Sequence, residues 1–191
     1  MARSRLTTER IELDPMTVDH LPSLVELDGD AEVLRYILGR ARTEQEAHDH
    51  WDPVCRDVEA DAVGLGWWVG RRRSDGDFLG WWDLSPARPV PARPVRAEAG
   101  WRLGRRRWGQ GLAPEGARAL LVYGFGDLGL QTVWAETMAV NAASRAVMTK
   151  LGMRHVRTDH RSWEDPLPGA EQGEVVYEID ASSWSARSCT A

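Results

Sequence analysis

The chain has 191 residues, of which 42% are hydrophobic and 28% are charged, so it can bury a sizeable core. The formal net charge of −5 argues against bulk electrostatic binding to nucleic acid or to an anionic membrane. The two cysteines, Cys55 and Cys189, give neither a disulfide framework nor a zinc spacing. We therefore expect a cytoplasmic protein without a metal site and without nucleic-acid or membrane partners.

The length favours one domain, which we expect over residues 1–181, followed by a flexible tail of small and polar residues at 182–191. No apolar run approaches the ~20 residues of a membrane-spanning helix. The first ten residues include arginines but lack the apolar segment of a signal peptide.

Hydrophobic periodicity and turn residues predict the secondary structure. In chain order we expect a strand at 5–16, helices at 18–27, 31–37 and 43–58, strands at 66–72, 77–84 and 96–103, a helix at 114–128, a strand at 132–138, a helix at 142–150, and strands at 153–157 and 173–179. This order is typical of an α+β fold with a central sheet of six to seven strands.

Local signals mark several element ends. Thr43 and Glu46 stand three residues apart, as in the capping box that opens a helix. Four prolines between residues 85 and 95 exclude a central strand there and predict a loop. Asn141 is placed to cap a helix, and Gly152 is placed to end it in the left-handed conformation.

Ten tryptophans accompany only three tyrosines and two phenylalanines. Two adjacent pairs, Trp67–Trp68 and Trp81–Trp82, lie in predicted strands that an Asp-Gly turn joins into a hairpin. We expect most of these rings to pack in the core. Trp68, Trp81, Trp82 and Trp101 are the candidates to line a substrate cleft, and both interpretations stay open at this point.

A basic loop with two glycines, residues 106–113, follows the strand at 96–103 and leads into a helix. Gly109 and Gly111 let the backbone turn sharply and approach a ligand closely, and Pro114 suits the first turn of a helix. The N-terminus of a helix approached by arginines is a ready site for phosphate. A plain strand–turn–helix connection with surface arginines is the alternative.

The motif Arg-x-x-Gly-x-Gly at 106–111 resembles the acyl-CoA-binding motif of the GNAT (Gcn5-related N-acetyltransferase) superfamily. Asn-x-x-Ser at 141–144, followed by Leu-Gly-Met at 151–153, resembles a second motif of that family, with Met153 in place of an aromatic residue. The run from 101 to 153 looks like the ribosomal-protein N-acetyltransferase branch, of RimJ/RimL type.

This resemblance implies a GNAT fold: a mixed sheet with helices on both faces, whose fourth and fifth strands, here 96–103 and 132–138, first pair and then splay apart. Acetyl-CoA would lie in the splay, with its pyrophosphate on the amides of the loop and its pantetheine arm pairing through its amides to extend the sheet, as an added strand would. The implied cofactor-binding residues are Trp101, Arg102, Leu103, Arg106, Arg107, Trp108, Gly109, Gln110, Gly111, Leu112, Ala113, Asn141 and Ser144.

The implied reaction is direct attack of an amine on the thioester. An alkylammonium with a pKa of ~10 must first lose a proton, and a carboxylate within reach can accept it. Glu98 and Glu136 lie on the two strands of the cleft, and related enzymes carry an acid near Glu98. Each carboxylate could instead be a solvent-facing strand residue.

Many family members protonate the departing thiolate with a tyrosine that aligns with Met148 here, and methionine cannot donate a proton. Ser144 is the substitute that the ribosomal-protein branch suggests. Asn141 would contact the pantetheine arm, or it could simply cap its helix.

The sequence therefore predicts an acetyl-CoA-dependent N-acetyltransferase that acetylates a primary amine in a ternary complex. The alternative, motivated by Met148, is a non-catalytic acyl-CoA-binding module on the same fold. The acceptor could be a small molecule or a protein N-terminus, and a homodimer is compatible with the sequence. Arginine triplets at 71–73 and 105–107 could bind nucleic acid, but the acidic total argues against it.

Overall fold

The computed structural model describes residues 3–188, which build one eight-stranded sheet in the order β1-β2-β3-β4-β5-β6-β8-β7. The strands are β1 (Leu6–Thr7), β2 (Ile11–Pro15), β3 (Gly66–Arg72), β4 (Phe78–Pro86), β5 (Arg96–Leu103), β6 (Thr132–Met138), β7 (Arg154–Asp159) and β8 (Glu174–Asp180). Among these described strands, β5 and β6 run parallel and every other neighbouring pair is antiparallel. The expected α+β class and mixed sheet are confirmed.

The sheet has more strands than the six to seven expected, because the predicted strand at 5–16 is divided in two. The Thr8 amide donates to the Ile11 carbonyl over 2.8 Å, and the Ile11 amide donates to the Thr8 hydroxyl over 2.9 Å. These bonds close a tight turn, so β1 folds back and pairs with β2.

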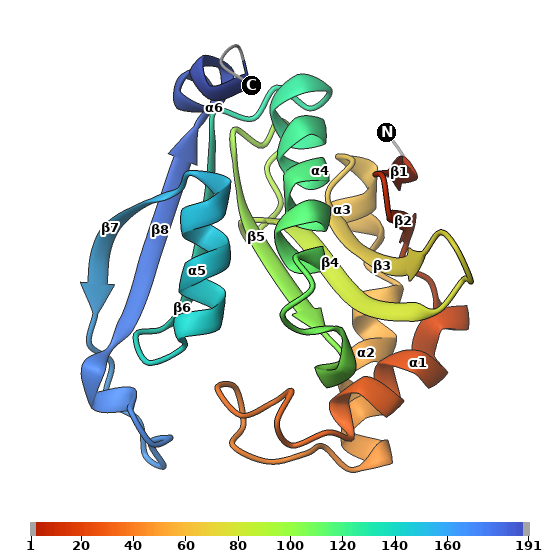
Figure 1. The fold of residues 1–191 in the computed structure, drawn as a ribbon, viewed down its shortest axis with the longest axis vertical. Helices are drawn as coiled ribbons and strands as arrows, with labels where there is room; N and C mark the ends of the chain where they lie inside the picture. Colours follow the sequence, from red (N-terminus) through yellow and green to blue (C-terminus); the bar gives the residue numbers. More distant parts are fainter. Residues whose placement is uncertain (1–2, 189–191) are drawn as a thin grey trace.

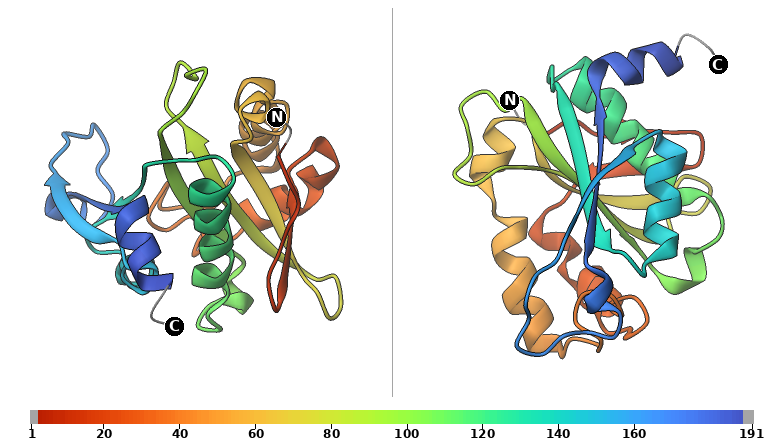
Figure 2. Two further views of the ribbon diagram at one scale, coloured as in Figure 1. Left: turned by 90° about the horizontal axis from the view of Figure 1, so that it is seen from above. Right: turned by 90° about the vertical axis from the view of Figure 1, so that its left-hand side faces the viewer.

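Helices cover both faces of the sheet, as the resemblance implies. The described α-helices are α1 (Leu21–Asp28), α2 (Glu44–Cys55), α3 (Val58–Ala62), α4 (Leu112–Gly126), α5 (Ala142–Leu151) and α6 (Ala181–Ser188). Helices α4 and α5 lie on one face, and α1 and α2 lie on the other (Figure 1, Figure 2). Within residues 3–188, none of them is long and apolar enough to cross a membrane.

The helix-capping residues predicted from the sequence are found where they act on neighbouring residues. Thr43 and Glu46 form the capping box at the start of α2, and Gly152 ends α5 with a φ of 82°. Residues 31–37 form hydrogen-bonded turns instead of the expected helix, and α3 was not predicted. Its first amides are capped by Asp57, whose side chain accepts from Ala60.

The expectation of a flexible tail at 182–191 is wrong for residues 182–188, which belong to α6. Trp184 is 8% exposed and joins the main hydrophobic core, where its ring lies 6.0 Å from that of Phe125. The Asp180 carboxylate opens the helix by accepting from the Ser183 amide. The burial of one indole ring therefore orders a segment that is otherwise mostly polar. Residues 189–191 lie outside the described part of the chain.

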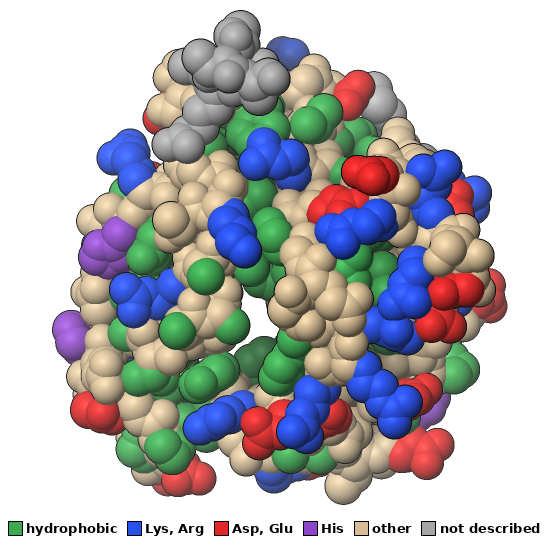
Figure 3. All heavy atoms as spheres, in the orientation of Figure 1, with side chains coloured by type: hydrophobic (Ala, Val, Ile, Leu, Met, Phe, Trp, Pro, Cys, Tyr) green, Lys and Arg blue, Asp and Glu red, His purple; other side chains and the backbone are tan. Residues whose placement is uncertain are grey.

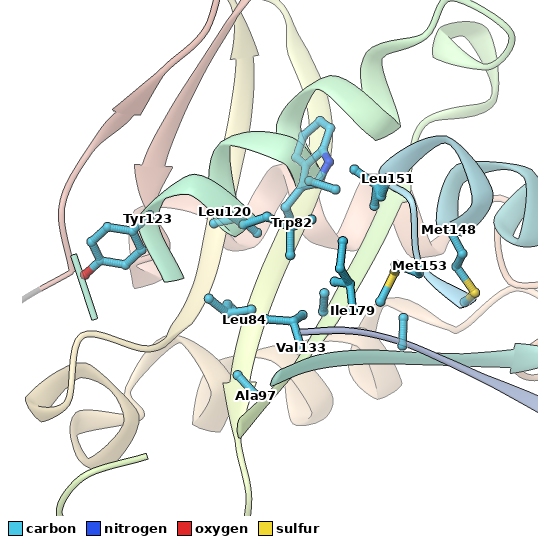
Figure 4. Packing of buried hydrophobic residues seen from close by; sticks show 14 of the residues in the cluster. Trp82, Leu84, Ala97, Leu120, Tyr123, Val133, Met148, Leu151, Met153 and Ile179 are labelled. Atoms are coloured by element: carbon cyan, nitrogen blue, oxygen red, sulfur yellow. The ribbon is translucent and has the colours of Figure 1, made fainter. Parts of the chain in front are cut away.

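Two hydrophobic cores lie on opposite faces of the sheet. Trp82 and Trp68 belong to the core beneath α4 and α5, in which Figure 4 shows Trp82, whereas Trp81 belongs to the core beneath α1 and α2. Neighbouring residues on a strand point to opposite faces, so each tryptophan pair divides its rings between the two sides.

The pairing of β5 with β6 is short. It covers residues 96–98 on one strand and 132–134 on the other, and beyond these the two strands separate. This confirms the splay that the resemblance implies for strands 96–103 and 132–138.

Candidate active site

A cleft of about 800 Å³ opens where β5 and β6 separate. Its lining comes from β4, β5 and β6, from the loop before α4, from α5, and from the turns at residues 32–37. Figure 3 shows the molecule hollowed between α5 and the loop that follows β5. The cleft connects the glycine loop on the α4 side of the sheet with carboxylates on the other side.

The glycine loop has the geometry expected of an anion cradle. Gly109 and Gly111 have φ angles of 71° and 76°, a region that favours glycine, and both line the cleft. Helix α4 begins directly after them, so the amides of Leu112 and Ala113 have no acceptor inside the helix. Free amides at the positive end of a 15-residue helix fit the pyrophosphate of acetyl-CoA.

The first turn of α4 is held from two sides. The Glu115 carboxylate accepts from the Thr8 hydroxyl and from the Arg10 side chain, each over 2.6 Å. On the sheet side, the Trp82 indole donates to the Ala113 carbonyl over 3.0 Å. These contacts fix the cradle before any ligand is bound.

One of the arginine side chains of the loop is paired within the protein. Arg107 lines the cleft but forms an ion pair with Asp77 at 2.8 Å. Gln110 donates to the Arg106 carbonyl, and neither of these two residues lines the cleft. The prediction that the backbone amides of this loop hold the pyrophosphate does not depend on these two side chains and stays a prediction. Lys150 of α5 adds a positive charge to the lining of the cleft, and it was not predicted from the sequence.

The free edge of β5 faces the splay. The Gly104 amide donates to the Leu79 carbonyl of β4 over 3.0 Å. Because peptide groups alternate along a strand, the amides of Trp101 and Leu103 point away from β4. The Trp108 indole N–H donates to the Leu103 carbonyl over 2.8 Å, so that carbonyl already has a partner. The Trp101 peptide is therefore at the edge, where an extended pantetheine arm could pair.

The side chain of Arg102 does not face the free edge of β5. It is 9% exposed and pairs with the buried Asp28 at 2.7 Å, on the face beneath α1 and α2. The expected cofactor contact at Arg102 is thus limited to its backbone.

Helix α5 borders the cleft opposite α4. The Asn141 side chain accepts from the Ser144 amide over 3.2 Å and donates to the Thr137 hydroxyl over 3.0 Å. Asn141 therefore caps the helix and also lines the cleft, together with Ser144. Met148 is buried and stands beside them, where the resemblance would place a tyrosine.

Carboxylates gather at the other end of the cleft. They are Asp83 on β4, Glu98 on β5, Glu136 on β6 and Glu174 on β8. Arg161, from the segment between β7 and β8, forms an ion pair with Glu136 at 2.8 Å. Within the described residues, no group of three or more His, Cys, Asp or Glu side chains could hold a metal ion.

Two of these carboxyl groups have strongly raised pKa values. Burial, with a smaller contribution from the charge of Glu136, raises the pKa of Glu98 to about 7, while Arg161 opposes the rise. Burial raises the pKa of Asp83 to about 8, and the hydrogen bond from Ser85 opposes it. Burial thus favours the protonated form of both carboxyl groups relative to carboxyl groups in water.

Of the four tryptophans considered for the substrate cleft, two line the cleft and two do not. Trp81 and Trp101 line the cleft, and so does Trp67, which the sequence analysis did not select. Trp68 and Trp82 are completely buried beneath α4 and do not line it. The substrate-binding role expected for Trp68 and Trp82 is therefore corrected to core packing.

Four more residues near the carboxylate end of the cleft were not predicted from the sequence: Asp83, Ser85, Glu174 and Arg161. Asp83 gave a usable signal, because it is a carboxylate inside an apolar strand, two residues from Trp81 and on the same face. Arg161 gave none, since its partner lies 25 positions away in the chain.

Comparison with known proteins gives concordant results. The Acetyltransferase (GNAT) domain family matches residues 10–154. Over 190 residues the chain is 41% identical to the FsC-acetyl coenzyme A-N(2)-transacetylase of Aspergillus fumigatus, a match that covers 96% of this chain and 79% of that protein.

Solved structures share the fold. A GCN5-related N-acetyltransferase from Brucella melitensis superposes with a TM-score of 0.78 at 17% identity, covering 97% of this chain and 82% of that one. The ribosomal-protein alpha-N-acetyltransferase RimL, in complex with coenzyme A, superposes with a TM-score of 0.73 at 16% identity, covering 93% and 98%. With the glycine cradle, the splayed strands and the family match together, the chain belongs to the GNAT acetyltransferase family and is an acetyl-CoA-dependent N-acetyltransferase.

Proposed function

We propose that this enzyme acetylates a primary amine that binds, as an ammonium ion, at the carboxylate end of the cleft. The observation that carries the proposal is the continuity of one cleft from the cradle at Gly109 and Gly111 to Glu98 and Glu136. A thioester in the splay would meet an amine held by these carboxylates, without a covalent enzyme intermediate.

In this mechanism Glu98 accepts a proton from the ammonium group, and the neutral amine attacks the thioester carbonyl that acetyl-CoA supplies. The free edge of β5 near Trp101 offers amides for the oxygen on which negative charge develops. When bound, acetyl-CoA would supply the thioester carbonyl and a thiolate leaving group. The second proton of the attacking nitrogen would go to that thiolate, and Ser144, which borders the cleft, is the side chain that we propose to pass it on.

Glu98 is a better base than Glu136 for an electrostatic reason. Glu136 is paired with Arg161 at 2.8 Å, so one of its carboxylate oxygens already accepts a charged hydrogen bond. Glu98 is half-buried, and its pKa of about 7 matches a base that works near neutral pH.

The test is the pH profile of kcat/KM. Activity should rise with pH through about 7, as Glu98 loses its proton. Glu98→Gln should lower kcat/KM by roughly 10²- to 10⁴-fold and abolish this rise.

Glu136→Gln is the matched control, because it makes the same chemical change in the same cleft. The rise should persist and move to lower pH, since Glu136 raises the pKa of Glu98. If Glu98→Gln keeps both its rate and its profile, Glu98 is not the base.

For the acceptor, we propose a cationic amine flanked by the rings of Trp67 and Trp81, which line the same cleft. FsC, the acceptor in the name of the Aspergillus fumigatus relative, is the first compound to assay, and a peptide with a free N-terminus is the second. Acetylation of the peptide alone would favour a protein N-terminus. The expected cytoplasmic location and homodimer stay predictions.

A further inference from the structure

One side chain in the cleft carries a positive charge that no carboxylate of the described residues neutralises. Four cationic side chains line the cleft, and three of them are paired. The pairs are Arg35 with Glu32 at 3.8 Å, Arg102 with Asp28 at 2.7 Å, and Arg107 with Asp77 at 2.8 Å. The fourth cation is Lys150 of α5, which is exposed and has no ion-pair partner within residues 3–188.

Lys150 also differs chemically from the other cations of the chain. Among the 24 lysine and arginine residues of the sequence it is the single lysine. The planar guanidinium of arginine suits forked pairing with a carboxylate, whereas the ammonium group of lysine is a compact point charge that commonly binds phosphate.

Helix α5 presents Lys150 to the cleft away from the carboxylates. Ala143, Val147 and Lys150 all line the cleft and recur at intervals of four and three residues, so they share one face of the helix. Glu136 precedes α5, whereas Lys150 stands in its last turn. At 1.5 Å per residue, about 13 Å of helix separates Asn141 from Lys150, so Lys150 and Glu136 belong to different parts of the cleft.

The last turn of α5 lies beside α4, the helix that follows the glycine cradle (Figure 1). Arg118 Nη2 of α4 is 3.5 Å from the Lys150 carbonyl oxygen. Arg118 is in the second turn of α4, about 10 Å beyond Gly111 along the helix. Lys150 is therefore on the cofactor side of the cleft, further along α4 than the amides that fit the pyrophosphate.

Coenzyme A carries a further phosphate besides its pyrophosphate, a monoester on the 3′ position of the adenosine ribose. A phosphate monoester has a second pKa of about 6, so it is mostly a dianion at neutral pH. The cradle at Gly109 and Gly111 accounts for the pyrophosphate, and the 3′-phosphate needs a different cationic partner.

We propose that Lys150 binds the 3′-phosphate of the cofactor and is the residue by which the enzyme distinguishes CoA from 3′-dephospho-CoA. Its ammonium group is exposed and unpaired, so it can meet a phosphate without breaking an ion pair inside the protein. Because this role concerns the cofactor alone, it is independent of the acceptor amine and of Glu98.

Isothermal titration calorimetry with CoA and with 3′-dephospho-CoA tests the contact. The wild-type protein should bind CoA more tightly by about fivefold or more. Lys150→Met should bind both compounds with the affinity that the wild type has for 3′-dephospho-CoA. Lys150→Arg keeps the charge and should keep most of the preference.

Arg145→Met is the matched control for a general effect of charge. It removes one positive charge from the same helix, but Arg145 does not line the cleft. The preference for CoA should therefore stay at the wild-type value in this variant.

Chemical labelling gives a second measurement that needs no substitution. Because the chain has a single lysine, reductive methylation followed by mass spectrometry reports on Lys150 directly, with the α-amino group of the chain as the reference. Saturating CoA should slow the labelling of Lys150, and saturating 3′-dephospho-CoA should slow it much less.

Two results would overturn the proposal. If Lys150→Met weakens the binding of both compounds equally, Lys150 does not recognise the 3′-phosphate. If CoA and 3′-dephospho-CoA protect Lys150 equally from methylation, the ammonium group does not contact that phosphate. A failure of Glu98 as the base would change neither measurement.

Discussion

At the scale of single residues, the cofactor end of the cleft depends more on backbone than on charged side chains. Gly109 would have open space around an added Cβ atom, so its role cannot be to avoid a clash within the protein. Its φ of 71° shapes the loop, and its bare surface lines the cleft. The side chain of Arg107, by contrast, forms an ion pair with Asp77.

The first prediction uses a matched pair of glycines. Gly109→Val should weaken acetyl-CoA binding by about tenfold or more, because the side chain would project toward the cofactor and strain the loop by roughly 1–2 kcal/mol. Gly76→Val is the control, since Gly76 has a φ of 75° and open space, but lies in the hairpin between β3 and β4.

Isothermal titration calorimetry with acetyl-CoA measures both variants. The two should lose similar stability, and Gly109→Val alone should lose affinity. Equal affinities would mean that the loop at 106–113 is only a structural connection.

At the scale of elements, Trp82 decides where α4 begins relative to the sheet. Its ring lies between Gly70 of β3 and Gly116 of α4, because a Cβ atom at either position would overlap it. Its indole N–H reaches the Ala113 carbonyl in the first turn of α4. Trp82, a candidate for the substrate cleft from the sequence, thus positions the first turn of α4 behind the glycine loop.

Gly116→Ala should therefore do more than its size suggests. The added methyl group must displace the Trp82 ring or the helix, which we expect to cost about 1–3 kcal/mol of stability and to weaken acetyl-CoA binding. Gly126→Ala is the matched control on the same helix, since nothing lies within 4 Å of its added Cβ atom. That control should be neutral or stabilising by about 0.4–1 kcal/mol. Urea denaturation of both proteins checks this, and equal midpoints would contradict the packing argument.

At the scale of the whole molecule, one buried carboxylate joins the layer of α1 and α2 to the sheet. Asp28 of α1 is fully buried and accepts from the Trp51 indole of α2 over 2.8 Å. It also pairs with Arg102 of β5 and with Arg42, which precedes α2. Arg102 also lines the cleft, so the side of the cleft beneath α1 and α2 depends on this network.

Asp28→Asn should destabilise the fold by about 3–5 kcal/mol, because two buried guanidinium groups lose their counter-charge. Asp52→Asn is the control: Asp52 pairs with Arg56 on the surface of α2, where side chains are 43% and 62% exposed. Solvent screens that pair, so its loss should change the stability little. Thermal unfolding followed by circular dichroism compares the two, and similar losses would show that the buried network is not the main link.

Much of the fold follows from short-range patterns, and these could be read in the sequence. The capping residues Thr43 and Asn141 act on amides three residues away, and the limits of β5 and β6 match the alternation of apolar residues. The predictions failed where a distant contact decided the outcome. Residues 182–188 are polar, yet they fold as α6 because Trp184 meets the core.

The sequence by itself predicted the family and the cofactor, because the motifs that resemble the GNAT family are continuous segments, and a glycine loop running into a helix has a local geometry. Only the tertiary structure decided which side chains share the carboxylate end of the cleft. Glu98, Ser85 and Asp83 meet through the register of β4 and β5, and Arg161 reaches Glu136 from a remote loop. Which face each tryptophan occupies, and how far burial moves the pKa of a carboxyl group, depend on neighbours that the linear chain does not specify.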